Sequence, residues 1–373
     1  MLKLAYKLLS IGLLCASCTN AQLGSTGSNP SLSGWRTNIA KHSIDLSEIE
    51  KGGPPKDGIP AIDRPQFVSV VEARQWLHER EPVIALAVNG EARAYPLQIL
   101  VWHEIVNDEV KGLPVTVTFC PLCYSAIAFD RRIEGQTLTF GVTGLLRRSD
   151  MVMFDRATES WWQQFTGEAI VGDLTGTKLQ QLPAQIIGFA QFAVAHPDGL
   201  VLSRETGFKR EYGKNPYAGY DDTNSSPILY RGKTDHRLRP MEKVVAVQID
   251  QLAKAYPYSI TRKLHVVQDQ VGLIDLVVFH GEGASSALDS IAMSESREVG
   301  ATGVFDSRVD GHLLHFRYET KEFLDTETGS HWNILGRAIS GPLRGKQLDP
   351  IVHGDYFAFA WLAFRPDTEI FRR

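Results

Sequence analysis

The sequence predicts a mainly β protein, a β-rich α+β fold with two tandem homologous domains, each a β-sandwich or barrel-like sheet. Three observations predict it. Short segments alternate between apolar and polar residues, turn signals separate these segments at regular distances, and the pattern of the first half recurs in the second.

The composition limits the class of protein. The chain has 373 residues, of which 43% are hydrophobic and 22% are charged. Such a composition is typical of an ordinary globular protein, and the length exceeds what one hydrophobic core usually serves. The formal net charge of −4 gives no basic excess, so we expect no nucleic-acid partner.

The first residues predict a lipoprotein signal peptide, residues 1–17. Lys3 and Lys7 are followed by a brief apolar stretch, which is shorter than the roughly 20 residues that span a bilayer. The segment ends in Cys-Ala-Ser-Cys and resembles a bacterial lipoprotein signal with Cys18 as the lipidation site. Cys15 departs from this pattern, because such signals usually carry Leu there.

Two alternatives to lipidation stay open: cleavage after Ala21, which would release a secreted protein, and an uncleaved anchor. Thr19 follows the cysteine, and by resemblance to Gram-negative lipoproteins this favours the outer membrane. We therefore expect an extracytoplasmic protein that is lipid-anchored to the membrane and faces the periplasm. Residues 18–56 are predicted to form a flexible tether.

The first β-rich repeat is predicted over residues 57–205. Its apolar run at 83–88 ends at Asn89-Gly90, which is the strongest short hairpin signal, and 115–119 alternates strictly. Further strands are expected at 91–95, 126–129, 137–142 and 151–154, and short helices at 69–78, 97–102 and 189–195.

The second β-rich repeat is predicted over residues 240–373, after a linker at 206–239. Its Ala255-Tyr-Pro answers Ala94-Tyr-Pro of the first half. A unit of this length indicates two similar domains and not a solenoid. Asp-x-x-Thr-x-Ser occurs in both halves, at Asp155 and at Asp325, followed each time by a Trp. Because both halves keep this pattern, we interpret it mainly as scaffold, with the Asp setting a turn.

One feature belongs to the first half alone, the sequence Cys120-Pro-Leu-Cys123 after a predicted strand. A structural disulfide is one interpretation, favoured outside the cytoplasm. Closing a loop of roughly four residues contributes only about 2 kcal/mol, against about 4.7 for roughly 100 residues. A redox-active dithiol is the second interpretation. It would lack the thioredoxin fold, because an alternating strand follows the pair where thioredoxin has a helix.

A metal site is the third interpretation. His103, also confined to the first half, is the best candidate for a further ligand, and Met151 or Met153 could add a thioether. Two thiolates with an imidazole and a thioether suit copper, whereas Cys/Cys/His with water suits zinc. His280, aligned with the cysteine turn, could reach the site if the halves pack about a pseudo-two-fold axis. Each of these residues could instead be structural.

Other polar or aromatic residues are candidates for lining a pocket. They are Arg148, Asp150, Asp155, Glu159 and Trp161. The alternative to a metal or redox site is a binding or assembly module with a cleft for a carbohydrate or a protein, in which the cysteines form a structural disulfide. A hydrolase using acidic residues is a third option. No hydrolase nucleophile elbow or phosphate-binding loop occurs, so the sequence identifies no catalytic residue.

These motifs together resemble an uncharacterised bacterial and archaeal family, the extracytoplasmic domain-of-unknown-function family 3179. The resemblance rests on the segments 103–108, 118–123, 144–150 and 153–163 and extends over about 57–370. It implies an extracytoplasmic location and points at Cys120, Cys123 and His103, without supplying a reaction. We therefore expect a Cys/Cys/His site for soft-metal binding or for thiol redox chemistry. Whether the protein is an enzyme stays open.

Overall fold

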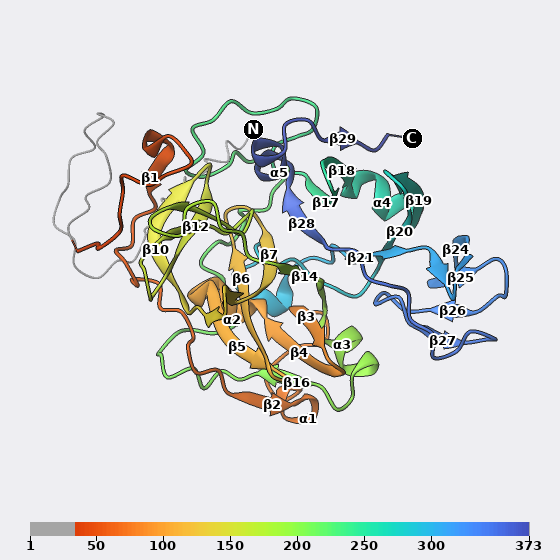
Figure 1. Cartoon of the computed structure of the whole chain (residues 1–373). Helices are drawn as coiled ribbons and strands as arrows, with labels where there is room; N and C mark the ends of the chain where they lie inside the picture. The colour runs from red at the N-terminus through yellow and green to blue at the C-terminus, as the bar shows by residue number, and fades with distance from the viewer. Residues whose placement is uncertain (1–33, 373) are drawn as a thin grey trace, which may run out of the picture.

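Strands are the predominant regular structure of the computed structural model, which describes residues 34–372. The prediction of a mainly β fold is confirmed, with several sheets and only short helices (Figure 1). The predicted signal peptide and the lipidation site Cys18 lie outside the described residues. Within that range, every helix falls short of the length and apolar character that a membrane crossing requires.

The first half starts from the predicted hairpin. β3 (Pro82–Val88) and β4 (Glu91–Pro96) pair antiparallel across Asn89-Gly90, and both turn residues have positive φ. Asn and Gly tolerate this conformation, which explains why this dipeptide closes the hairpin. The surrounding sheet has the order β15-β3-β4-β16-β2. Its other strands are β15 (Ala184–Gly188), β16 (Leu200–Leu202) and β2 (Phe67–Ser69).

Two further sheets complete the first half. After α2 (Leu97–His103), the strands β5 (Ile105–Val110), β6 (Leu113–Cys120) and β7 (Ser125–Asp130) form a meander, with β14 (Gln181–Leu182) at its edge. The next sheet consists of β1 (Ile49–Lys51), β10 (Phe140–Arg147), β11 (Asp150–Asp155), β12 (Trp161–Gln163) and β13 (Glu168–Val171). The short elements are η1 (Leu46–Glu48), α1 (Val70–Ala73), β8 (Arg132–Ile133), β9 (Gln136–Thr137) and α3 (Phe189–Ala195).

The second half has a closely similar order of elements. β17 (Lys243–Ile249) and β18 (Leu252–Pro257) form its hairpin, α4 (Tyr258–Leu264) follows, and β19 (Val266–Val271) pairs with β20 (Ile274–Gly281). Its remaining elements are η2 (Met293–Glu295), β21 (Ala301–Asp306), β22 (Arg308–Val309), β23 (His312–Leu313), β24 (Phe316–Glu319), β25 (Glu322–Asp325), β26 (His331–Trp332), β27 (Ala338–Ser340), β28 (His353–Phe357), α5 (Ala358–Phe364) and β29 (Glu369–Ile370). A common origin of the two halves stays a prediction.

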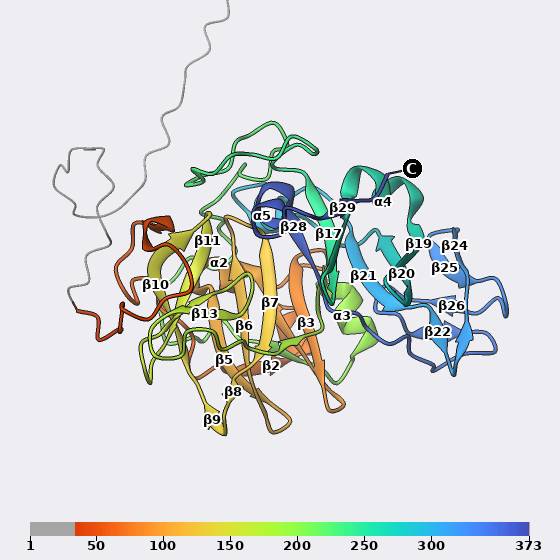
Figure 2. The ribbon, with the colours of Figure 1, turned by 45° about the horizontal axis from the view of Figure 1, so that its top comes forward.

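The two halves share hydrophobic packing, since two of the four apolar clusters contain residues of both. β28 of the second half packs against β7 of the first, and β15 packs against β21 in return (Figure 2). One apolar cluster joins Phe165 of the first half to Tyr356 of the second, with ring centroids 4.8 Å apart. The predicted linker, residues 206–239, also packs against the first half, where Tyr220 donates a hydrogen bond to the Leu122 carbonyl at 3.0 Å.

Part of the predicted tether, residues 18–56, is folded. β1 pairs with β10, and Trp35 packs edge-on against Trp161 with ring centroids 5.4 Å apart. Arg36 forms an ion pair with Glu159 at 3.0 Å. The prediction of a free tether is therefore corrected from residue 34 onward, because this segment has an apolar surface and charged partners on the first half.

Candidate metal centre

The cysteines lie in a tight turn between two antiparallel strands. β6 ends at Cys120, which pairs with Ser125 at the start of β7. The Cys123 amide donates to the Cys120 carbonyl at 3.3 Å, and Tyr124 has a φ of 56°. This confirms the predicted β-turn. Because a strand and not a helix follows the turn, no helix N-terminus lowers the thiol pKa values as it does in thioredoxin.

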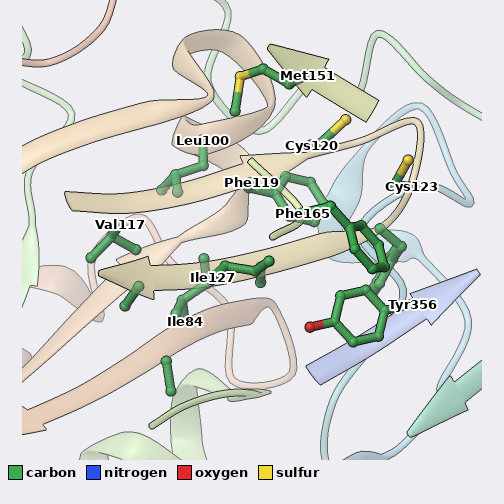
Figure 3. Packing of buried hydrophobic residues seen from close by; sticks show 14 of the residues in the cluster. Ile84, Leu100, Val117, Phe119, Cys120, Cys123, Ile127, Met151, Phe165 and Tyr356 are labelled. Atoms are coloured by element: carbon green, nitrogen blue, oxygen red, sulfur yellow. The ribbon is translucent and has the colours of Figure 1, made fainter. Parts of the chain in front are cut away.

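The turn brings the two thiols to a carboxyl group. One ligand atom each from Cys120, Cys123 and Asp150 lies within 4.8 Å of the others, and all three residues are buried. Both cysteines are free, so the structural disulfide considered above is not present. Figure 3 shows both sulfur atoms at the end of β6, beside the apolar cluster that contains Met151 and Phe165.

Asp150 reaches the thiols because a two-residue turn places it at the start of β11. Arg147 pairs with Asp150 across Arg148-Ser149, and both turn residues have positive φ. The Asp150 carboxylate accepts hydrogen bonds from Gln163 Nε2 at 2.6 Å and from the Phe165 amide at 3.0 Å. Burial raises the pKa of Asp150 to about 7, and these hydrogen bonds limit the rise. They also fix the orientation of the carboxylate, as outer-shell partners of metal ligands do.

Glu104 adds a second buried carboxyl group. It ends α2 in the left-handed conformation, at φ 58°. Among residues 34–372 its carboxyl group has no hydrogen bond and no ion pair. Burial first, and then the negative charge of Asp150, raise the pKa of Glu104 to about 8. Its charge also acts on Cys120, whose thiol pKa is raised chiefly by burial.

The charges of the four acidic groups of this corner act on one another, Asp150 on Glu104 and both carboxyl groups on Cys120. Burial and the neighbouring Cys120 raise the pKa of the Cys123 thiol well above its ordinary value. In the absence of a cation, all four groups are driven toward their neutral, protonated forms. A divalent cation would reverse this preference, because it favours thiolates and carboxylates as ligands.

His103 is not part of this group, which corrects the predicted Cys/Cys/His set. Both of its ring nitrogens are occupied, one by the Pro60 carbonyl and one by the Tyr212 hydroxyl, each at 2.7 Å. Burial lowers the pKa of this histidine to about 4. The reason is local: α2 ends at His103, and the left-handed Glu104 redirects the chain there. At this helix end, the charge that acts on Cys120 is that of the next residue, Glu104, and not that of the histidine.

The other predicted ligands also lie in structural positions. Met151 and Met153 are fully buried members of the apolar cluster. The pairing of β19 with β20 repeats that of β5 with β6, so His280 corresponds to Phe119 and not to the cysteine turn. Its ring nitrogens contact the Thr261 hydroxyl at 2.9 Å and the Val299 carbonyl at 3.3 Å. His280 therefore does not reach the first-half site.

Two of the predicted pocket residues anchor turns. Asp155 accepts hydrogen bonds from the Thr158 amide at 2.6 Å and from Trp162 Nε1 at 3.0 Å. Arg148 forms an ion pair with Glu48 at 3.2 Å. Both residues hold neighbouring segments together, as the scaffold interpretation of Asp155 expected.

The remaining two hold the N-terminal segment. Glu159 binds the Arg36 amide at 2.8 Å and Lys56 Nζ at 3.0 Å. Trp161 has no exposed surface. Trp161 therefore lines no pocket open to solvent, and the neighbouring Trp162 is also fully buried.

Sequence reasoning missed two aspects of this corner. Asp150 was a pocket candidate and not a partner of the thiols, and Glu104 was one acidic residue among many. A usable signal existed for Asp150, since it closes the polar, first-half-specific segment 144–150. For Glu104 the signal is its place in the family segment 103–108, although nothing there indicates that its charge acts on the thiols.

The comparisons with known proteins agree with the resemblance seen in the motifs. The model of a family described as "Protein of unknown function (DUF3179)" matches residues 56–368. Neither the curated proteins nor the solved structures contain a match. The matched region includes the whole cysteine corner, Glu104 and Asp150.

Proposed function

The chain belongs to the DUF3179 family, and we propose that it holds a thiophilic divalent cation, Zn²⁺, in a buried centre formed by Cys120, Cys123 and Asp150. One observation carries this proposal: the three ligand atoms lie within 4.8 Å of one another. Zinc binds sulfur at about 2.3 Å and carboxylate oxygen at about 2.0–2.2 Å. Tetrahedral ligands at such distances are separated by roughly 3.5–4 Å, so the three atoms suit a single ion.

The donor set favours zinc over copper. The copper alternative depends on an imidazole beside the thiols, but both ring nitrogens of His103 are occupied by other groups. Two sulfur atoms with a carboxylate oxygen suit zinc better than the softer Cu(I). The carboxyl group of Glu104 or a water molecule would complete the shell.

The charge of the corner supports the same assignment. Two thiolates balance the two positive charges of Zn²⁺, and Asp150 adds one negative charge. Binding would release protons from groups whose pKa values are raised when no ion is bound. The hydrogen bonds from Gln163 and Phe165 keep Asp150 in place in either state.

Thiol redox chemistry is the second candidate, and Asp150 is the observation that favours it. A buried carboxylate with a pKa of about 7 beside Cys123 can accept the thiol proton during exchange with a partner disulfide. That exchange oxidises the two thiols to a disulfide and reduces the partner disulfide to two thiols. Burial of both sulfur atoms weighs against it, because a redox partner needs access.

The cellular setting is also proposed, from the first residues alone. Lipidation at Cys18 would hold the protein at a membrane surface facing the periplasm. A centre of this kind would then serve in metal storage, in transfer or as a structural element in that compartment.

Metal analysis of the full chain, purified with reduced thiols, tests the centre. We expect one zinc ion per chain. Cys120→Ser should abolish binding, and Asp150→Asn should weaken it by about 10–100-fold or more, since it removes a charged ligand. His103→Gln is the matched control and should retain the metal, because its ring nitrogens face Pro60 and Tyr212.

Two results would contradict the zinc centre. Loss of metal in His103→Gln with retention in Asp150→Asn would restore the Cys/Cys/His set. A metal-free chain whose two thiols interconvert reversibly with a disulfide in a glutathione buffer would favour the redox candidate.

A further inference from the structure

A second candidate site is an open pocket at the start of the second half, with the buried Lys243 among charged residues that include exposed arginines. A pocket of about 440 Å³ opens where the segment 206–239 crosses the start of β17 and the helix α4. Six of its lining residues are charged: Asp221, Arg239, Glu242, Lys243, Arg262 and Arg297. The pocket lies within the size range of small-molecule sites.

Lys243 is the unusual member of this lining. The residue is only 7% exposed, and its Nζ lies 3.5 Å from the centroid of the Tyr124 ring. Among residues 34–372 the ammonium group has no hydrogen bond and no ion pair. The cation–π contact with Tyr124 offsets only part of the cost of removing an ammonium group from water. Lys243 is thus a lining residue whose ammonium group has no carboxylate of the described chain within ion-pair distance, and the charges of Asp221 and Asp355 act on it from further away.

The other charges leave the pocket with an excess of positive charge. Arg297 is paired with Asp221 at 2.9 Å and also with Asp289. Arg239 and Arg262 are exposed and have no carboxylate partner in the described chain. Glu242 is partly engaged, since one of its oxygens accepts the Ser259 amide at 3.3 Å. Because Arg297 is already paired with two carboxylates, the charged lining residues outside that group are three cations, Lys243, Arg239 and Arg262, and one carboxylate, Glu242.

We infer that this pocket binds a small molecule carrying an oxyanion, a carboxylate or a phosphate group. Lys243 would contact the oxyanion at the floor, with Arg262 and Arg239 at the rim. A compact ammonium group and two guanidinium groups are suited to such a ligand. Burial lowers the pKa of Lys243 to about 8, so the group is mostly charged at neutral pH.

The pocket adjoins the proposed zinc centre but does not depend on it. Tyr124 follows Cys123 directly, and its ring forms the contact with Lys243. The backbone connects the two sites as well, because the Phe357 amide donates to the Cys123 carbonyl at 3.0 Å and Phe357 pairs with Lys243. The ring of Tyr124 would therefore connect a ligand bound to Lys243 with the cysteine turn.

Calorimetric titration of the full chain at neutral pH and low salt tests this inference, with inorganic phosphate and succinate as separate probes. We expect saturable binding of at least one probe, and the stronger probe identifies the oxyanion. Lys243→Met should weaken binding by about 10-fold or more, since a hydrogen bond to a charged group contributes about 1.5–3 kcal/mol. Arg262→Ala should weaken it less. Lys263→Met, which removes an exposed lysine of α4 outside the pocket lining, should leave binding unchanged.

Several outcomes would overturn the inference. Absence of binding for both probes at millimolar concentration is one, and unchanged binding in Lys243→Met is another. If Lys243→Met fails to fold by circular dichroism, Arg262→Ala decides, because that side chain is exposed; unchanged binding there overturns the rim contact and the assignment. Cys120→Ser keeps the two proposals distinguishable, since it should lose zinc and still bind the probe.

Discussion

The ends of β6 and β20 occupy equivalent places in the two halves but are built differently. In the first half, Cys120 pairs with Ser125 and four residues close the turn. In the second half, Gly281 pairs with Ala301, and the long loop 282–300 takes the place of that turn. The same strand arrangement is thus followed by a compact, thiol-containing turn in the first half and by a long loop that lines the Lys243 pocket in the second.

Other features occur in both halves with the same geometry. Trp162 donates to Asp155 at 3.0 Å, and Trp332 donates to Asp325 at 2.9 Å. A tyrosine–aspartate hydrogen bond is also repeated: Tyr95–Asp108 at 2.7 Å and Tyr256–Asp269 at 3.1 Å. Such pairs belong to the frame, whereas features present once are the candidates for function.

The C-terminal ends of α2 and α4 have the same backbone conformation in both halves but different side chains. Glu104 and His265 both have positive φ, at 58° and 62°. Each amide closes the helix at 2.7 Å, and each carbonyl accepts an amide at 2.8 Å from the second strand after the helix, β6 or β20. The backbone is therefore shared, and only the side chain differs. In the first half, that side chain is the carboxyl group beside the thiols.

The largest effect should come from removing the shared tryptophans. Trp162→Ala and Trp332→Ala should each lower the free energy of unfolding by about 3–5 kcal/mol, because each leaves a cavity and removes one hydrogen bond to a buried aspartate. Urea unfolding of both variants measures this. A loss under about 1 kcal/mol in one variant alone would show that the two halves are not equivalent in their frame.

In the metal-free protein, Glu104→Gln should change the free energy of unfolding by a smaller amount, on the order of 1–3 kcal/mol. The pKa of Glu104 is raised to about 8 in the folded state, so folding takes up protons between about pH 4.5 and 8. Stability from the protonated carboxyl group is present below that range and is lost as the pH rises through it. Glu104→Gln should therefore flatten the fall in the free energy of unfolding with pH.

The matched control for this measurement is Glu109→Gln, an exposed carboxyl group on the neighbouring β5. Its pH profile should follow that of the unmodified chain. If the pH profile of Glu104→Gln also follows that of the unmodified chain, burial does not raise the pKa of Glu104. Added zinc should reduce the pH dependence of the unmodified chain if the carboxyl group joins the centre.

The smallest effect is expected at Glu159, whose counterpart in the second half is Gly329. Burial would raise the pKa of Glu159, but hydrogen bonds from Arg36 and Lys56 outweigh it and lower the pKa to about 2. The stability that this pair contributes is present above about pH 4.5 and lost as the pH falls toward 2. Glu159→Gln should cost about 1 kcal/mol at neutral pH, measured by urea unfolding, and nothing at pH 2. An equal cost at both pH values would contradict an ionic origin.

Local patterns predicted much of this frame. Asn89-Gly90 fixed a hairpin, the alternation at 115–119 lies within β6, and the strand after Cys123 ruled out a thioredoxin-like helix. Each of these depends on residues close together in the chain. The predicted ligand set was wrong at His103. The left-handed conformation of one residue, Glu104 at the end of α2, sets the directions in which the side chains of His103 and Glu104 point.

The sequence by itself determined that strands dominate, that the Asp-x-x-Thr-x-Ser turns recur, and that two thiols share one β-turn, since backbone preference and side-chain periodicity act over a few residues. Tertiary structure alone decided that Asp150 lies against those thiols, that the charge of Glu104 acts on Cys120, and that Lys243 lies over the Tyr124 ring. These contacts join positions far apart in the chain. Strand pairing and the packing of one half on the other select them, and no local propensity encodes that choice.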